Sequence, residues 1–100
     1  LLSRELCMTV KRWIVINNCK NIIRQLSVIA ADVNNPQKSE WQYLLDLARQ
    51  MLSEAKSGQF ESAKKNWIEL QQKVTALNAS GTITQELETS AVQLKEAGLL

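Results

Sequence analysis

Apolar side chains recur along this chain at alternating steps of three and four residues, the spacing that keeps one side of a helix apolar. The pattern is clearest in two consecutive segments, which carry the stripes Trp41, Leu45, Ala48, Leu52, Ala55 and Phe60, Ala63, Trp67, Leu70, Val74, Leu77. Gly58 stands between them, and glycine accepts the left-handed backbone that helix ends need. The pattern therefore predicts helices over about 40–57 and 60–78, joined as a hairpin with Trp41 and Trp67 in its core.

A third stripe near the end of the chain predicts a last helix over about 83–97; its members are Ile83, Leu87, Ala91, Leu94 and Ala97. Two hydroxyl residues stand where capping boxes are expected, three positions before a glutamine. Ser39 precedes Gln42, and Thr82 precedes Gln85. Such a hydroxyl accepts a hydrogen bond from a free N–H group of the first helical turn, so we expect Ser39 and Thr82 to cap their helices.

The first third of the chain is less regular. One stripe, over about 4–16, consists of Leu6, Val10, Trp13 and Ile14, and a broader one, over about 19–33, consists of Cys19, Ile22, Ile23, Leu26, Ile29, Ala30 and Val33. Asn17 and Asn18 lower helix propensity between them, so we predict a break or kink there. One unbroken helix up to Val33 is the alternative. Pro36 stops the pattern, since the residue before a proline disfavours helical geometry.

These elements predict an all-α fold: one domain, a small four- or five-helix bundle, mainly antiparallel because the connections are short. In the 100 residues, 45% are hydrophobic and 22% charged, which is typical of a folded globular chain rather than a disordered one. The chain does not begin with methionine. We expect a fragment or a processed product, or a native start at Met8.

The composition offers little catalytic chemistry. There is no histidine, which removes the commonest general base and metal ligand and excludes Ser–His and Cys–His nucleophiles. Cys7 and Cys19 cannot by themselves hold a zinc ion, and we expect both to be free thiols in a reducing compartment. The sequence thus predicts no catalytic, cofactor or metal site, and no enzyme. The apolar run over 13–16 is too short to be a signal peptide or to cross a membrane, so we expect a cytoplasmic protein that does not insert into a bilayer.

Two sets of residues are candidates for binding. Apolar side chains off the main stripes are candidates for partner contact, although each could equally pack on the first or last helix: Trp13, Ile16, Tyr43, Leu47 and Ile68. Net charge is only +2, but basic residues concentrate in the first third. Lys11, Arg12, Lys20 and Arg24 are candidates for contact with phosphates or an acidic protein. No nucleic-acid-binding motif accompanies them, so we do not expect a nucleic acid partner.

The order Gly58, Phe60, Ala63, Trp67 resembles the second half of a tetratricopeptide-type helical hairpin, over about 44–74. The resemblance implies two helices that approach closely at the small residue. Met51 and Glu54 depart from the motif, and no second copy follows, although stacked repeats need about three. Segments 20–23, 36–39 and 84–98 also resemble small helical bacteriocin immunity proteins. Segments 19–26 and 60–63 are similar to the helical domain of the steroid receptor RNA activator protein and the Sec31 C-terminus, whose Trp/Gly-Val-Lys segment is missing here.

From these observations we expect a non-catalytic protein–protein interaction module, such as an adaptor, chaperone, inhibitor or immunity-type partner. It would recognise another protein, or a second copy of itself, through a helix face or groove. The alternative is a module that contacts a membrane surface or nucleic acid through its basic first third. That alternative requires the four cations to gather on one face, and binding to weaken steeply with salt.

Overall fold

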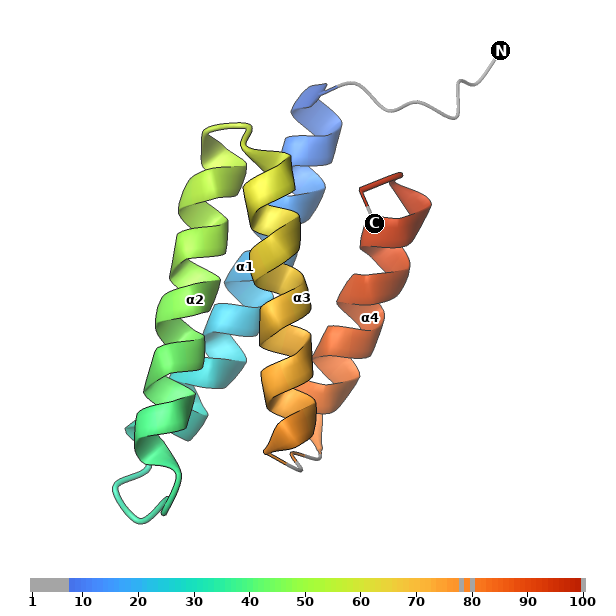
Figure 1. Cartoon of the computed structure of the whole chain (residues 1–100). Helices are drawn as coiled ribbons and strands as arrows, with labels where there is room; N and C mark the ends of the chain where they lie inside the picture. Colours follow the sequence, from blue (N-terminus) through green and yellow to red (C-terminus); the bar gives the residue numbers. More distant parts are fainter. Residues whose placement is uncertain (1–7, 78, 80, 100) are drawn as a thin grey trace.

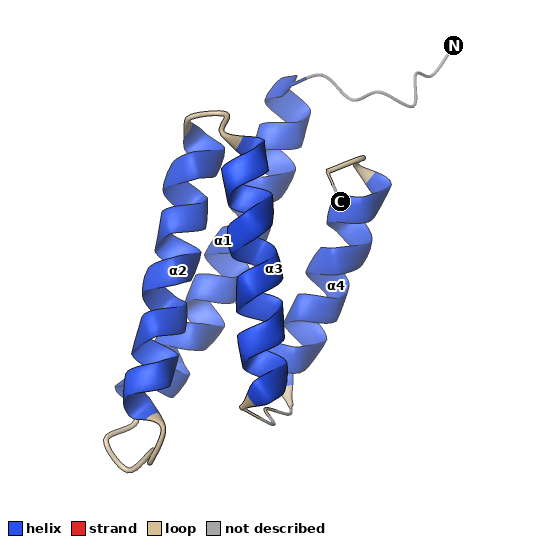
Figure 2. Ribbon diagram, in the orientation of Figure 1, coloured by secondary structure: helices blue, strands red, loops and turns tan. Residues whose placement is uncertain are grey.

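The computed structural model describes residues 8–77, 79 and 81–99 of the chain. Within them all regular structure is helical: α1 (Met8–Ala31), α2 (Lys38–Lys56), α3 (Phe60–Ala76) and α4 (Thr82–Glu96). Figure 1 shows α2 and α3 side by side with α1 behind them, and α4 beyond α3. The predicted all-α class is confirmed, and the described residues form four helices, the lower of the two predicted numbers. Figure 2 shows the short loops that join them. Residues 4–7 and 78, which we expected to be helical, lie outside the described residues.

The predicted break at Asn17 and Asn18 is wrong, because α1 passes through both residues without interruption. Asparagine usually weakens a helix by offering its side chain to the backbone of competing conformations. Here the Asn18 side chain is used inside the helix. Its Nδ2 donates a hydrogen bond to the carbonyl oxygen of Ile14, 2.8 Å away and one turn back. Asn17 points outward and is exposed.

The other predicted helix ends are right to within two residues, but three details are wrong. α1 stops at Ala31, and Val33 is 77% exposed in the following turn, because the Asp32 carboxylate accepts the backbone N–H of Asn34 and stabilises that turn. Ser39 does not cap α2, because the helix already begins at Lys38, one residue before it. The Ser39 hydroxyl instead donates to the neighbouring Glu40 carboxylate.

Thr82 does not cap α4 either. Gly81 occupies the N-cap position, with φ 86° and ψ −143° and without a side-chain cap. Thr82 is therefore already inside the helix, where its hydroxyl is one position too late to act as the cap. The nearby hydroxyl of Thr84 donates instead to the carbonyl oxygen of Ala79, 3.2 Å away.

The turn between α2 and α3 forms as the glycine predicts. Gly58 has φ 76°. Its N–H donates to the carbonyl of Ala55 at 3.1 Å, and the next N–H, of Gln59, donates to Glu54 at 2.8 Å. This pair of bonds is the Schellman motif, which satisfies carbonyls that the end of a helix leaves free. The hairpin thus closes with three residues between its helices.

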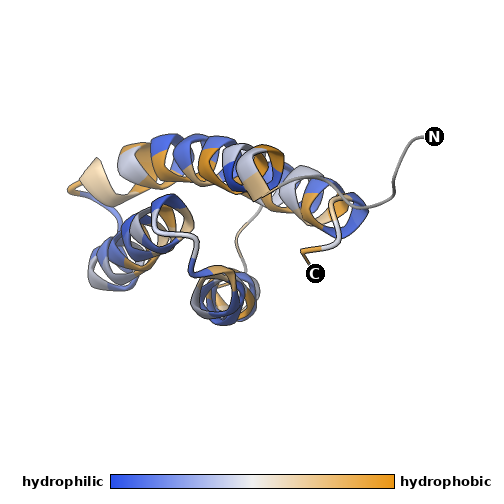
Figure 3. Ribbon diagram, turned by 90° about the horizontal axis from the view of Figure 1, so that it is seen from above, coloured by the Kyte–Doolittle hydropathy of each residue, from blue (hydrophilic) through white to orange (hydrophobic). Residues whose placement is uncertain are grey.

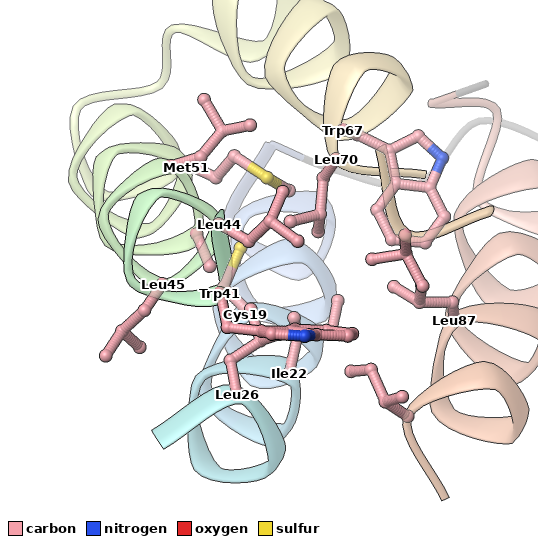
Figure 4. Packing of buried hydrophobic residues seen from close by; sticks show 14 of the residues in the cluster. Cys19, Ile22, Leu26, Trp41, Leu44, Leu45, Met51, Trp67, Leu70 and Leu87 are labelled. Atoms are coloured by element: carbon pink, nitrogen blue, oxygen red, sulfur yellow. The ribbon is translucent and has the colours of Figure 1, made fainter. Parts of the chain in front are cut away.

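The apolar stripes form one core. α1 packs against both α2 and α4, and α2 packs against α3. Trp41 and Trp67 are 5% and 2% exposed, so both are core residues as predicted, and Figure 4 shows them entering the cluster from α2 and α3. In Figure 3 hydrophobic and hydrophilic positions alternate around each helix, as expected for amphipathic helices that bury one side.

Candidate functional site, a groove between α1 and α4

The most exposed aromatic side chain of the described residues stands beside a groove between α1 and α4. Trp13 is 64% exposed. Together with Ile14 and Asn17 it forms the α1 side of this groove, and Gln93, Glu96 and Ala97 form the α4 side. A large indole in water is unusual, because burial of such a side chain is strongly favourable.

Helix geometry explains why Trp13 faces outward. The buried residues of α1 are Val15, Asn18, Cys19, Ile22, Leu26 and Ala30. At 3.6 residues per turn, Trp13 falls on the opposite side of the helix from this set. Asn17, Lys20 and Arg24 follow it at steps of four, three and four residues, so they continue the same exposed stripe. The stripe begins apolar at Trp13 and becomes basic towards the middle of α1.

A buried polar cluster links α1 to α4 beside the groove. The Asn18 side chain is 3% exposed and Ser90 is 0% exposed. Ser90 Oγ donates to Asn18 Oδ1 at 2.8 Å, and Asn18 Nδ2 donates to Gln93 Oε1 at 3.0 Å. These two bonds set the register of α4 on α1. They also hold the Gln93 side chain at the edge of the groove, one turn from Ala97.

The five predicted partner-binding residues do not form one surface. Trp13, Tyr43 and Ile68 are exposed, at 64%, 48% and 41%, but they belong to α1, α2 and α3. Ile16 is half-buried against the core. Leu47 is 5% exposed and lies inside the core, so its assignment as a contact residue is wrong. α2 packs against both α1 and α3. The buried face of α2 is therefore wider than its main apolar stripe predicts.

Tyr43 is engaged by its neighbours on α3. Its hydroxyl donates to the Glu69 carboxylate, and the Lys73 ammonium lies 5.4 Å from the centre of its ring. The hydrogen bond to Glu69 raises the pKa of Tyr43 above its ordinary value. Ring and hydroxyl therefore serve the contact between α2 and α3, whereas the Trp13 indole borders an open groove.

The four predicted anion-contacting residues do not gather on one face. Nine positions separate Lys11 from Lys20, which places them on about opposite sides of a continuous helix. The Arg12 guanidinium points to the turn between α2 and α3, where its Nη2 lies 3.2 Å from the place that a Cβ on Gly58 would occupy. Lys20 and Arg24 remain together, on the exposed stripe of Trp13.

No cluster of three or more potential metal ligands occurs among residues 8–77, 79 and 81–99. Cys19 is buried as a free thiol, and its burial, with a smaller effect from the negative charge of Glu54, raises its pKa to about 12. Such a thiol is a poor nucleophile. Cys7 lies outside the described residues. None of the described helices combines the length and apolarity needed to cross a bilayer.

A separate small cavity lies against Trp67 in the core. Its volume is about 20 Å³ and its lining is almost entirely apolar, from Val15, Met51, Phe60, Ala63, Trp67 and Leu94, with Lys64 and Leu99. That space would admit about one water molecule, and an apolar cavity of this size offers water few partners. It is a packing gap, too small for an organic ligand.

Sequence reasoning found Trp13 but missed the α4 side of the groove. Gln93, Glu96 and Ala97 carry no distinguishing signal, because their importance comes only from the position of α4 on α1. The one available signal was Ser90, a hydroxyl on the apolar side of the last helix, which could have been paired with the asparagines of the first.

Comparison with known proteins finds no matching family model, no matching curated protein and no matching solved structure. The resemblances to tetratricopeptide hairpins and to immunity proteins are neither supported nor opposed by this result.

Proposed function

We propose that this protein is a non-catalytic interaction module that binds another protein chain in the groove between α1 and α4, with Trp13 as the central contact. The exposure of Trp13 beside this groove carries the proposal. The bundle is taken as mainly antiparallel, in keeping with its short connections. A cytoplasmic location and a reducing environment belong to the same proposal.

The residues that line the groove have the composition of a small protein–protein interface. Trp13, Ile14 and Ala97 supply apolar surface, while Asn17, Gln93 and Glu96 supply polar groups around it. Interfaces commonly place an aromatic anchor among apolar contacts and surround it with polar residues that exclude water. Tryptophan is among the residues whose truncation costs most at interfaces, typically about 2 kcal/mol or more. We therefore expect Trp13 to dominate the affinity.

The groove also has rigid walls. It is formed by two helices that are fixed to each other by the hydrogen bonds of Asn18 with Ser90 and Gln93. A preorganised site loses little conformational entropy on binding, which favours affinity for a given contact area. An apolar helix face of the partner would fit such a site.

Site-specific photocrosslinking tests the proposal. A photoreactive amino acid at Asn17, on the groove, should give a covalent protein adduct in the cells that express the chain. The same group at Gln72, an exposed position on α3, is the control. The adduct should disappear in a Trp13→Ala background that retains its helical circular dichroism. Equal crosslinking from both positions, or none from Asn17, would contradict the proposal.

The alternative, contact with a membrane surface or nucleic acid, predicts different results. Binding to anionic vesicles or to a nucleic acid would fall steeply with salt, and would be lost in a Lys20→Gln, Arg24→Gln variant while Trp13→Ala retained it. That outcome, without a protein adduct at Asn17, would replace the proposal.

A further inference from the structure

The charges around the groove are arranged so that the surface complements itself. α1 contains Lys11, Arg12, Lys20 and Arg24 and no acidic residue. α4 contains Glu86, Glu88 and Glu96 and one basic residue, Lys95. The two helices that form the groove thus carry opposite net charge, basic on α1 and acidic on α4, and among the residues that line the groove Glu96 is the charged one.

Glu86 lies on the same side of α4 as the residues that line the groove. Glu86 and Gln93 are seven positions apart, which is about two turns, so both lie on the groove side of α4. On α1 the exposed stripe that starts at Trp13 continues through Lys20 and Arg24. The face therefore carries two positive charges beside α1, and Glu86 and Glu96 beside α4.

Arg24 and Glu86 stand at similar heights along this face. Asn18 and Ser90 are hydrogen-bonded and mark one level. Trp13 and Ala97 border the groove on the other side of that level, so residue numbers rise along α1 as they fall along α4. Arg24 is six positions beyond Asn18 and Glu86 is four positions before Ser90, rises of about 9 and 6 Å.

Arg24 is available for an external partner. Its guanidinium donates to the Asn21 side chain at 3.1 Å, and among the residues that the structure describes it takes part in no ion pair. Its exposed position next to Lys20 leaves two like charges one turn apart, which an opposite charge would stabilise.

We infer that the groove binds a second copy of this chain, as a two-fold dimer in which α1 of each protomer lies against α4 of its partner. This inference rests on the proposed function and names its partner. A two-fold axis parallel to the helices places each α1 opposite the partner's α4 at the same height. Each Trp13 then contacts the region of the partner's Glu96, and each Arg24 faces the partner's Glu86. Pairing α1 with α1 would instead oppose like charges, which is unfavourable.

Sedimentation equilibrium of the 100-residue chain tests the inference. The mass should approach twice 11.3 kDa with rising concentration, and association should weaken with added salt. Trp13→Ala should weaken dimerisation at least about tenfold, whereas Ile68→Ser, at an exposed site on α3, should leave it unchanged.

A charge exchange separates this arrangement from nonspecific association. Arg24→Glu and Glu86→Lys should each weaken the dimer at least about tenfold, because each places like charges together twice in a two-fold interface. The double variant Arg24→Glu, Glu86→Lys restores opposite charges and should recover the dimer. Failure of this recovery, with both single variants folded, would overturn the proposed pairing.

The same measurements distinguish failure of the inference from failure of the proposed function. If the chain is monomeric at every concentration while Asn17 crosslinks to a different protein, the inference is wrong and the proposed function stands. If the chain is monomeric and Asn17 gives no adduct, both are wrong. An adduct of twice the chain mass supports both.

Discussion

The hydroxyl of Ser90 on α4 donates a hydrogen bond to the side-chain amide oxygen Oδ1 of Asn18 on α1, over 2.8 Å and with both residues buried. The remaining polar group of Asn18 is used as well, by the Ile14 carbonyl and by Gln93. Among the described residues no buried side-chain nitrogen or oxygen lacks a partner. A satisfied polar cluster inside a helix interface fixes the alignment of the two helices more strictly than apolar contacts do.

Ser90→Ala should lower the free energy of unfolding by about 1–3 kcal/mol, because it leaves the Asn18 oxygen buried without a donor. Urea unfolding followed by circular dichroism measures this. Ser62→Ala, at an exposed position on α3, is the matched control and should change stability by no more than about 0.5 kcal/mol. An equal effect of the two substitutions would show that the bond contributes nothing specific.

Leu47→Ala should destabilise the protein by about 2–5 kcal/mol, since the side chain is 5% exposed and its truncation leaves a cavity. Ile68→Ala removes a similar side chain from a site that is 41% exposed on α3, and should cost much less, about 0.5 kcal/mol. Thermal unfolding of the two variants side by side checks the contrast. A small loss for Leu47→Ala would argue against its place in the core.

Gly58 and Gly81 should respond differently to the same substitutions. Gly58 has φ 76°, in the left-handed region, where alanine costs about 1–2 kcal/mol and asparagine less. Gly81, with φ 86° and ψ −143°, occupies a region open essentially to glycine alone, so alanine and asparagine should both cost about 1–3 kcal/mol.

Chemical denaturation of the four glycine variants measures these costs. Apart from its chain neighbours, no atom of the described residues lies within 4 Å of a Cβ placed on Gly81, so the loss there would come from the backbone. At Gly58 the Arg12 side chain lies nearby and can move aside. If asparagine proved as costly as alanine at Gly58, the left-handed turn would not be the reason for the glycine.

The stability of the protein should fall above about pH 9 because of Cys19. The folded state holds the thiol proton up to about pH 12, whereas the unfolded chain releases it near the ordinary value of 9.0. Between these values the unfolded state binds fewer protons, so rising pH favours unfolding, by up to about 1.4 kcal/mol per pH unit. Below pH 9 the effect is absent.

Urea unfolding of the native chain and of Cys19→Ala, each between pH 8 and 11, tests this expectation. The variant lacks the thiol but keeps the tyrosine and the lysines, so the difference between the two curves isolates Cys19. Parallel curves would mean that the thiol ionises as readily in the folded protein as in the unfolded chain.

Much of the fold could be predicted because it depends on local spacing. The stripes of α2, α3 and α4 are governed by the helical repeat, and the burial of Trp41 and Trp67 follows from it. The turn at Gly58 depends on one residue and its immediate neighbours. These features need no knowledge of distant parts of the chain.

The predictions that proved wrong depend on contacts between distant parts of the chain. Whether Asn18 breaks α1 depends on Ser90 and Gln93, which stand more than seventy positions away. Whether Leu47 is exposed depends on where α1 and α3 pack against α2. The groove beside Trp13 exists only through the position of α4. Spacing along the sequence contains no direct information on such contacts, so the candidate site could be predicted only on its α1 side.

Trp13 stands in water while the other two indoles, Trp41 and Trp67, are enclosed. Their emission should therefore lie at shorter wavelength than that of Trp13, and a water-soluble quencher such as acrylamide should reach Trp13 alone. Trp13 is thus an intrinsic fluorescent reporter of the groove. A chain bound in the groove would be detected as protection of Trp13 from the quencher.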